Sequence, residues 1–99
     1  MNDFKDKVVV ITGAGGGLGK AHAIEFAKRG AKVVVNDLGG SGDGTGKGDM
    51  ADKVVEEIRA LGAEAIANKA SVSDKEGAQS IIDDAVSAFG AVDILVNNA

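Results

Sequence analysis

Residues 12–19 have the sequence TGAGGGLG and follow directly after the apolar run at residues 8–11. Glycine lacks a Cβ atom, so the backbone of such a turn can adopt positive φ angles and come close to a ligand. A helix that begins at the turn directs free N–H groups and the positive end of its dipole at an anion. The segment therefore predicts a binding site for a phosphate or pyrophosphate group.

The spacing of the glycines decides which of two glycine-rich sequence patterns the turn follows. The pattern G-x-G-x-x-G fails, because Leu18 or Lys20 stands where its last glycine belongs. The pattern G-x-x-x-G-x-G fits through Gly13, Gly17 and Gly19. The alternative is a glycine-rich connection between strand and helix that binds nothing.

An acidic residue stands where a ribose-binding carboxylate is expected. Asp37 follows the predicted strand at residues 32–36, whose apolar residues are 33–35, and lies 18 residues beyond Gly19. A carboxylate at this place accepts hydrogen bonds from the adenosine ribose hydroxyls and repels a 2′-phosphate. Gly16 in the turn offers no basic side chain to hold such a phosphate. Asp37 and Gly16 together predict NAD rather than NADP as the cofactor. The alternative is that Asp37 only caps the loop beside Asn36.

The other candidate motifs indicate no chemistry. In the second glycine-rich segment, residues 39–48, a phosphate loop would need glycine in place of Ser41 and a hydroxyl residue in place of Gly48. A calcium loop would need glutamate in place of Val54. We expect a mobile loop without a metal. The only histidine, His22, is expected to lie on a helix flank with no catalytic role.

Composition excludes several classes of function. The chain has no cysteine, which excludes disulfides and thiolate metal sites. Its formal net charge is −4 and its basic residues form no cluster, so we expect no binding to nucleic acid or to an anionic membrane. No apolar run has the length of a membrane span. We expect a soluble intracellular protein.

The elements that position these residues alternate between short apolar runs and amphipathic stripes, the pattern of βαβ units with a buried parallel sheet. The predicted strands are 7–12, 32–36, 64–68 and 92–97, and the predicted helices are 18–29, 49–61 and 73–89. Right-handed crossovers favour a three-layer, Rossmann-type α/β fold with a four-stranded parallel sheet in the order 3-2-1-4. The first two helices would cover one face and the third the other. We expect residues 1–99 to form one partial dinucleotide-binding domain.

Local signals mark the ends of these elements. The Ala-rich strand at 64–68 suits an edge of the sheet. A capping box is predicted at the start of the third helix, with Ser73 and Glu76 each satisfying the other's backbone N–H group. Gly90 is expected to end that helix in the left-handed conformation.

With the glycine turn, Asp37 and the terminal Asn97-Asn98-Ala99 in hand, the chain resembles the short-chain dehydrogenase/reductase family over its whole length. Within it, residues 34–40 and 51–58 are similar to the (3R)-hydroxyacyl-CoA dehydrogenase unit of peroxisomal multifunctional enzymes. The resemblance implies NAD as cofactor and a peroxisomal or cytoplasmic location. It implies cofactor contacts along the turn, after the second and third strands and at the terminal motif: Gly13, Gly16, Gly17, Leu18, Gly19, Asp37, Leu38, Ser71, Val72, Asn97 and Ala99.

The sequence also departs from the family. Members are more than twice as long, and their catalytic Ser, Tyr and Lys lie beyond the Asn-Asn-Ala motif, whereas this chain has no tyrosine. The family usually has an Asp after the third strand that contacts the adenine amino group, but this chain has Ala70-Ser71-Val72 there. We therefore expect binding of the ADP part of NAD without hydride transfer. The alternatives are a folding or assembly scaffold that binds nothing, the N-terminal part of a longer (3R)-hydroxyacyl-CoA dehydrogenase, or a complete small oxidoreductase.

The strand at 92–97 predicts a partner. In the full family fold this strand is interior, but here Ile94, Leu95 and Val96 would form an apolar edge shielded only by Asp93. A two-fold homodimer that pairs the strand with its copy would satisfy the edge and form a continuous sheet. A domain-swapped dimer and a marginal monomer are the alternatives.

Overall fold

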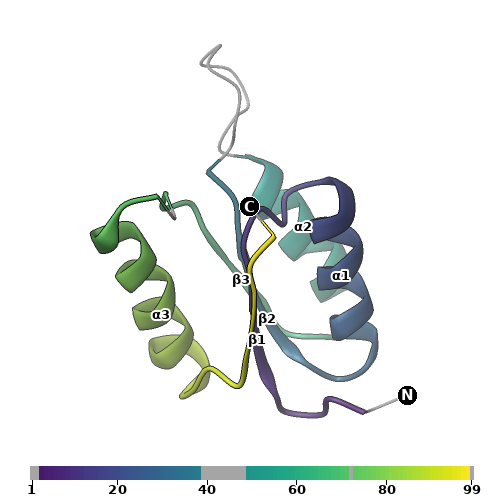
Figure 1. Cartoon of the computed structure of the whole chain (residues 1–99). Helices are drawn as coiled ribbons and strands as arrows, with labels where there is room; N and C mark the ends of the chain where they lie inside the picture. The colour runs from purple at the N-terminus through teal and green to yellow at the C-terminus, as the bar shows by residue number, and fades with distance from the viewer. Residues whose placement is uncertain (1–2, 39–48, 72, 99) are drawn as a thin grey trace.

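In the computed structural model, which describes residues 3–38, 49–71 and 73–98, a four-stranded parallel sheet lies between two layers of helices (Figure 1). The elements in chain order are β1 (Val8–Ile11), α1 (Gly17–Lys28), β2 (Lys32–Asn36), α2 (Asp49–Ala60), β3 (Ala65–Asn68), α3 (Lys75–Phe89) and β4 (Ile94–Val96). The strand order is β3-β2-β1-β4, which confirms the predicted fold. The segment 39–48, predicted to be a mobile loop, lies outside the described residues.

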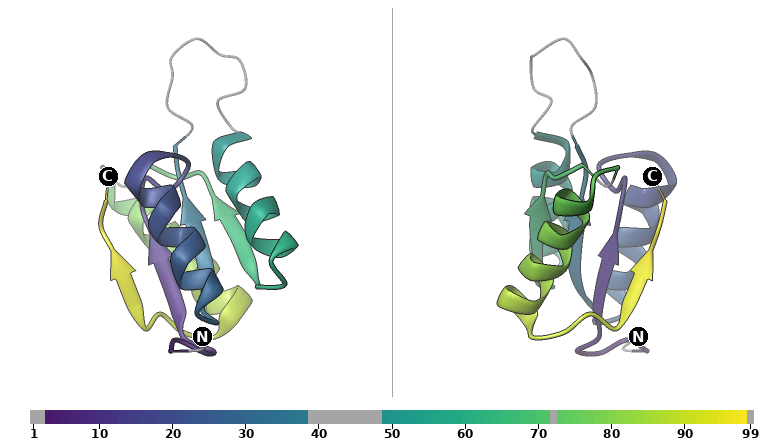
Figure 2. Two further views of the ribbon diagram at one scale, coloured as in Figure 1. Left: turned by 90° about the vertical axis from the view of Figure 1, so that its right-hand side faces the viewer. Right: turned by 60° about the vertical axis from the view of Figure 1, so that its left-hand side comes forward.

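The strands divide their side chains between the two faces. Val9 and Ile11 of β1 pack with α1 and α2, and Val8 and Val10 pack with α3. All four β1 residues are buried, as expected for a central strand of a parallel sheet that helices cover on both sides. Figures 1 and 2 show α1 and α2 together on one face and α3 alone on the other, as predicted.

The single helix α3 covers its face only in part. It lies over β1, β2 and β3, and within the described part of the chain no helix backbone approaches β4 (Figure 2). Ile81 and Ala85 are the buried positions of its apolar stripe, whereas Val86 is 49% exposed. This face is therefore open beside β4.

The start of α3 differs from the predicted capping box. Asp74 is the N-cap, and its Oδ1 accepts a hydrogen bond from the Gly77 N–H over 2.6 Å. The Ser73 hydroxyl lies 2.7 Å from the Ser71 hydroxyl instead of capping the helix. The box was wrong because the helix begins one residue later, and the short Asp side chain then reaches the third helical residue. Gly90 ends α3 with φ 88°, as predicted.

Candidate functional site

The glycine turn lies at the carboxyl end of β1 and leads directly into α1. Gly13 and Gly17 have φ angles of 62° and 57°, in the left-handed region that favours glycine. The Ala14 N–H donates to the Asn36 carbonyl over 2.8 Å, so the turn is tied to the end of the neighbouring strand β2. Gly16 precedes α1, and its carbonyl accepts the first hydrogen bond of that helix, from the Lys20 N–H.

Close packing explains a third glycine of the turn. A Cβ atom on Gly19 would collide with the Gly13 carbonyl oxygen and would lie 2.6 Å from the Asn98 Nδ2. By contrast, a Cβ on Gly17 would meet nothing within 4 Å, and the neighbouring Leu18 is 69% exposed. The turn thus packs tightly on its inner side and presents bare backbone on its outer side.

The predicted carboxylate lies against this turn. Asp37 Oδ2 accepts a hydrogen bond from the Gly15 N–H over 2.8 Å. A Cβ atom on Gly15 would lie 2.7 Å from the same oxygen and 2.7 Å from Met50 Cβ in the first turn of α2. Two features that are 22 positions apart in the sequence therefore meet at one place.

A hollow of about 300 Å³ lies beside Asp37 at the carboxyl ends of the strands. Parallel α/β sheets bind their ligands at this end. Four predicted residues, Gly13, Asp37, Leu38 and Ser71, line the hollow, and the side chain of Leu38 is largely exposed. The full lining is Gly13, Asn36, Asp37, Leu38, Ala70, Ser71 and Ser73.

Two buried asparagines hold one wall of this hollow, and the sequence analysis missed their role. Asn36 Nδ2 donates to Asn68 Oδ1 and to the Ala70 carbonyl, both over 3.0 Å. Asn68 Oδ1 also accepts from the Ala70 N–H over 2.9 Å. Asn68 Nδ2 donates to Asp84 Oδ2 of α3 over 2.7 Å. A polar residue at the end of each of two apolar runs was the available signal.

Both asparagines of the terminal motif contact the glycine turn. The Asn98 N–H donates to the Thr12 hydroxyl over 2.9 Å, and Asn98 Nδ2 donates to the Gly13 carbonyl over 3.1 Å. Asn97, predicted to contact the cofactor, accepts from the Thr12 hydroxyl over 3.2 Å. The predicted residues Val72 and Ala99 lie outside the described residues.

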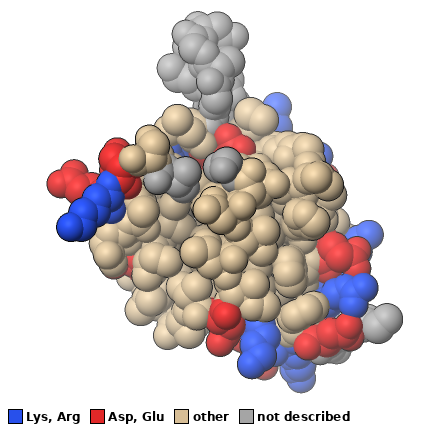
Figure 3. Space-filling view, viewed as in Figure 1, with Lys and Arg blue, Asp and Glu red and all other residues tan. Residues whose placement is uncertain are grey.

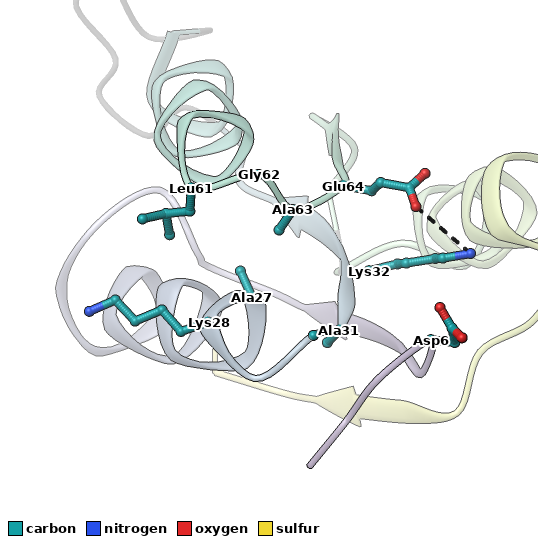
Figure 4. Close-up of a pocket in the computed structure, with 10 residues that line it drawn as sticks. Asp6, Ala27, Lys28, Ala31, Lys32, Leu61, Gly62, Ala63 and Glu64 are labelled. Carbon is teal, nitrogen blue, oxygen red and sulfur yellow. Dashed lines mark ion pairs between the residues drawn. The ribbon is translucent and has the colours of Figure 1, made fainter. Parts of the chain in front are cut away.

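A second hollow, of about 360 Å³, lies at the opposite end of the sheet where α1 and α2 end (Figure 4). At its rim Lys32 Nζ and Glu64 Oε2 form an exposed ion pair 3.9 Å long. Exposed pairs of this kind stabilise little. None of the predicted site residues lines this hollow, so it is separate from the candidate site.

The described residues define what the site can hold. Backbone N–H groups at the start of α1, a nearby carboxylate and a hollow between strand ends fit a nucleotide with a phosphate group. Within the described ranges, no group of three or more His, Cys, Asp or Glu side chains is placed to hold a metal ion. In the same ranges no helix is long and apolar enough to cross a membrane.

Comparison with known proteins agrees with this architecture. The family model for short chain dehydrogenases matches residues 7–99, and the chain belongs to that family. It is 63% identical over 98 residues to the peroxisomal multifunctional enzyme A of Dictyostelium discoideum, which covers 98% of this chain and 22% of that protein. The chain thus spans about a fifth of the length of this relative.

Solved structures show the same likeness. A short chain dehydrogenase from Mycobacterium avium superposes with a TM-score of 0.87 at 50% identity, covering 96% of this chain and 34% of that one. A 7α-hydroxysteroid dehydrogenase complexed with NADH and 7-oxo glycochenodeoxycholic acid superposes with a TM-score of 0.83 at 42% identity. That match covers 94% of this chain and 33% of the hydroxysteroid dehydrogenase.

Proposed function

We propose that residues 1–99 form the partial dinucleotide-binding domain of a short chain dehydrogenase and bind the ADP part of NAD. The observation that carries this proposal is the hydrogen bond from the Gly15 N–H to Asp37 Oδ2, 2.8 Å long, which brings the turn and the acidic residue together. The similar 7α-hydroxysteroid dehydrogenase structure, which is a complex with NADH, supports a nicotinamide dinucleotide as the ligand.

The residues present fit each part of this ligand. The outer side of the turn offers bare backbone at Gly17, where no atom lies within 4 Å of a Cβ position, and would hold the pyrophosphate. The N-terminus of α1 adds free N–H groups and the positive end of its dipole. When bound, NAD supplies a hydride acceptor, and these residues would hold the ADP part of the molecule.

Asp37 supports NAD over NADP. A carboxylate accepts hydrogen bonds from both ribose hydroxyls, and its charge opposes a 2′-phosphate. Lys20, in the first turn of α1, forms an ion pair with Glu57 over 3.0 Å. This pairing leaves the charge of Lys20 partly compensated, which disfavours a role in holding an additional phosphate.

Calorimetric titration of the purified chain with NAD and NADP tests this preference. NAD should bind at least about tenfold more tightly, because a hydrogen bond to a charged group contributes about 1.5–3 kcal/mol. Asp37→Ala should remove the difference. NADP binding that equals or exceeds NAD binding would show that Asp37 has been assigned the wrong role.

A second titration tests which part of the cofactor is held. ADP-ribose and NAD should bind within about tenfold of each other, since the predicted contacts are all with the ADP part. Gly17→Val should abolish binding of both. Gly62→Val is the matched control, because Gly62 also has a positive φ, 89°, and open space at its Cβ position, but lies at the far end of α2. Equal losses in the two variants would point to general strain.

We further propose that these 99 residues do not transfer hydride, because the sequence offers no tyrosine for the acid–base step of the family. An assay with NAD and a 3-hydroxyacyl-CoA should show no turnover that co-purifies with the chain.

A scaffold that binds nothing is the first alternative, and the NAD titration excludes it if heat is released. The identity with peroxisomal multifunctional enzymes favours a second, the N-terminal part of a (3R)-hydroxyacyl-CoA dehydrogenase. The same relatives favour a peroxisomal location over the cytoplasmic alternative, and imaging of a tagged chain would test it.

We also propose that the chain forms a homodimer through β4. This strand is at the end of the sheet order and pairs with β1. Leu95 at its centre is 57% exposed, and it lines an apolar hollow of about 210 Å³ with Ile81 and Ile82 of α3. A strand edge with unpaired backbone groups beside exposed apolar side chains is a template for pairing with another strand.

The charge distribution favours a second copy as the partner. Asp93, which was predicted to shield this edge, is exposed, and its Oδ2 accepts a hydrogen bond from the Val8 N–H of β1 over 2.8 Å. In Figure 3 the surface over β4 is free of Lys, Arg, Asp and Glu, and charged side chains lie around its rim. In a two-fold dimer each patch meets its own copy, and an uncharged patch does so without repulsion.

Light scattering during size-exclusion chromatography tests the dimer. The unchanged chain should be dimeric at protein concentrations on the order of tens of micromolar. Leu95→Lys should be monomeric, because two like charges would meet at the two-fold axis of the dimer. Mixing Leu95→Lys with Leu95→Asp should restore a dimer. Leu61→Lys is the control, since Leu61 is 50% exposed far from β4. A monomeric unchanged chain, or a dimer that Leu95→Lys does not alter, would refute this interface.

A further inference from the structure

The carboxyl ends of β2 and β3 carry the polar residues Asn36 and Asn68, which are only 2% and 5% exposed. The other buried side chains of these strands are Val33, Val34, Val35 and Ala65. Burying an amide is costly unless its hydrogen bonds are replaced. Within the described residues no buried side-chain nitrogen or oxygen lacks a partner, so each buried polar atom of the two amides has at least one hydrogen bond.

We propose that Asn36 and Asn68 are positioning residues that hold the segment 68–71, and with it one wall of the hollow beside Asp37, for the adenosine part of the ligand. This inference rests on the proposed function. Asn36 Nδ2 reaches across from β2 to Asn68 Oδ1 and to the Ala70 carbonyl, and Asn68 Oδ1 accepts from the Ala70 N–H. One side chain of β2 therefore fixes both the end of β3 and the backbone that follows it.

The helix α3 holds the same segment from the other side. Asn68 Nδ2 donates to Asp84 Oδ2 over 2.7 Å and to the Ser80 hydroxyl over 3.2 Å. At the first turn of α3, a Cβ atom on Gly77 would collide with the Ser71 carbonyl oxygen. Backbone contact at Ser71 and side-chain contact at Asn68 thus place the segment between β2 and α3.

The network also sets the position of Asp37 relative to this wall. The Asp37 N–H donates to the Asn68 carbonyl over 3.0 Å, directly after the residue whose side chain holds Ala70. The Asp37 carboxylate and the opposite wall of the hollow are thereby linked through Asn36, Asp37 and Asn68, at the ends of β2 and β3. Satisfied buried polar networks of this kind make an arrangement rigid and unique.

The test compares binding with stability in the whole chain. Asn36→Val removes the donor and introduces a residue that favours strands. Val34→Ala is the matched control because Val34 lies two residues earlier on the same face and is also buried. We expect Asn36→Val and Asn68→Ala to weaken binding of NAD and of AMP about tenfold, and Val34→Ala to change it less than twofold despite its loss of stability. Binding of inorganic pyrophosphate should change in none of them.

Two outcomes would overturn the inference. The first is unchanged NAD affinity in a folded Asn36→Val or Asn68→Ala chain. The second is a loss in Val34→Ala as large as in these variants, which would show that stability alone is responsible. If Asn36→Val does not fold, Asp84→Asn, which weakens only the contact of Asn68 with α3, should still reduce NAD affinity about threefold, and an unchanged affinity would refute the role.

A measurement without ligand separates this inference from the proposed function. In the free chain the Ala70 amide should exchange its hydrogen at least about tenfold faster in Asn36→Val than in Val34→Ala at matched stability. If the unchanged chain does not bind NAD, the proposed function fails while this result still decides whether Asn36 holds the segment. Equal exchange in the two variants would exclude that role.

Discussion

The two faces of the sheet share the same strands but differ in how far they are closed. Among the described residues, 13 buried side chains form the core under α1 and α2, and 5 form the core under α3. Ala23 and Ala27 of α1 let that helix lie close to the strands, and α2 adds an unbroken apolar stripe beside it. On the other face α3 lies over β1, β2 and β3 and leaves β4 open.

This difference separates two tasks within one small domain. The closed face carries the turn, and α1 begins there with Gly19 packed against Gly13. The open face carries the apolar hollow beside Leu95, which a second copy is proposed to cover. Pyrophosphate binding at the turn should therefore depend on the packing of the first face, and assembly on the exposure of the second.

The largest expected effect comes from placing a charge on each face. Val55 on α2 is 5% exposed, and Val86 on α3 is 49% exposed. Val55→Asp should leave the chain unfolded, because an unpaired buried charge costs several kcal/mol and a small domain has only about 5–15 kcal/mol of stability. Val86→Asp should fold and lose less than about 1 kcal/mol. Circular dichroism and urea unfolding measure both, and comparable losses would mean that the faces are equally closed.

A milder pair tests the same comparison by removing volume. Ile58 of α2 is fully buried, whereas Ile82 of α3 is half-buried beside the apolar hollow. Ile58→Ala should lower the free energy of unfolding by about 2–5 kcal/mol, and Ile82→Ala by less than about 1.5 kcal/mol. The unfolding of both variants should be measured at a protein concentration at which the chain is monomeric. A larger loss for Ile82→Ala would reverse the assignment of the closed and open faces.

Much of the fold could be predicted because its signals are local. The apolar runs of β1 and β2 and the glycines after each helix mark the elements, and right-handed crossovers then leave one sheet order. Of the candidate site, the meeting of the turn with Asp37 follows from that order. The structure adds that the Asp37 carboxylate contacts the Gly15 N–H, a detail of side-chain conformation that spacing does not reveal.

The features that sequence analysis missed depend on contacts between distant residues. Asn36 and Asn68 look like ordinary polar residues at strand ends, and their pairing across 32 positions follows only from the register of β2 and β3. The hydrogen bond from the Val8 N–H to Asp93 joins residues 85 positions apart, and the charge of Asp93 alone does not reveal it. Each of these side chains had two possible neighbourhoods, and packing selected one.

The smallest expected effect concerns the first turn of α3, where sequence and structure assign the cap to different residues. Asp74 Oδ1 accepts from the Gly77 N–H, while the Ser73 hydroxyl pairs with Ser71. Asp74→Ala should therefore lower the free energy of unfolding by about 1 kcal/mol, because the lost cap leaves a helix N–H without its partner. Ser73→Ala, the control, should cost less than half as much, since Ser73 is exposed and outside the helix. Urea unfolding of both variants decides between them. A larger loss of unfolding free energy for Ser73→Ala than for Asp74→Ala would instead identify Ser73 as the cap. The helix would then begin earlier, and the turn between β3 and α3 would be shorter, as the sequence predicted.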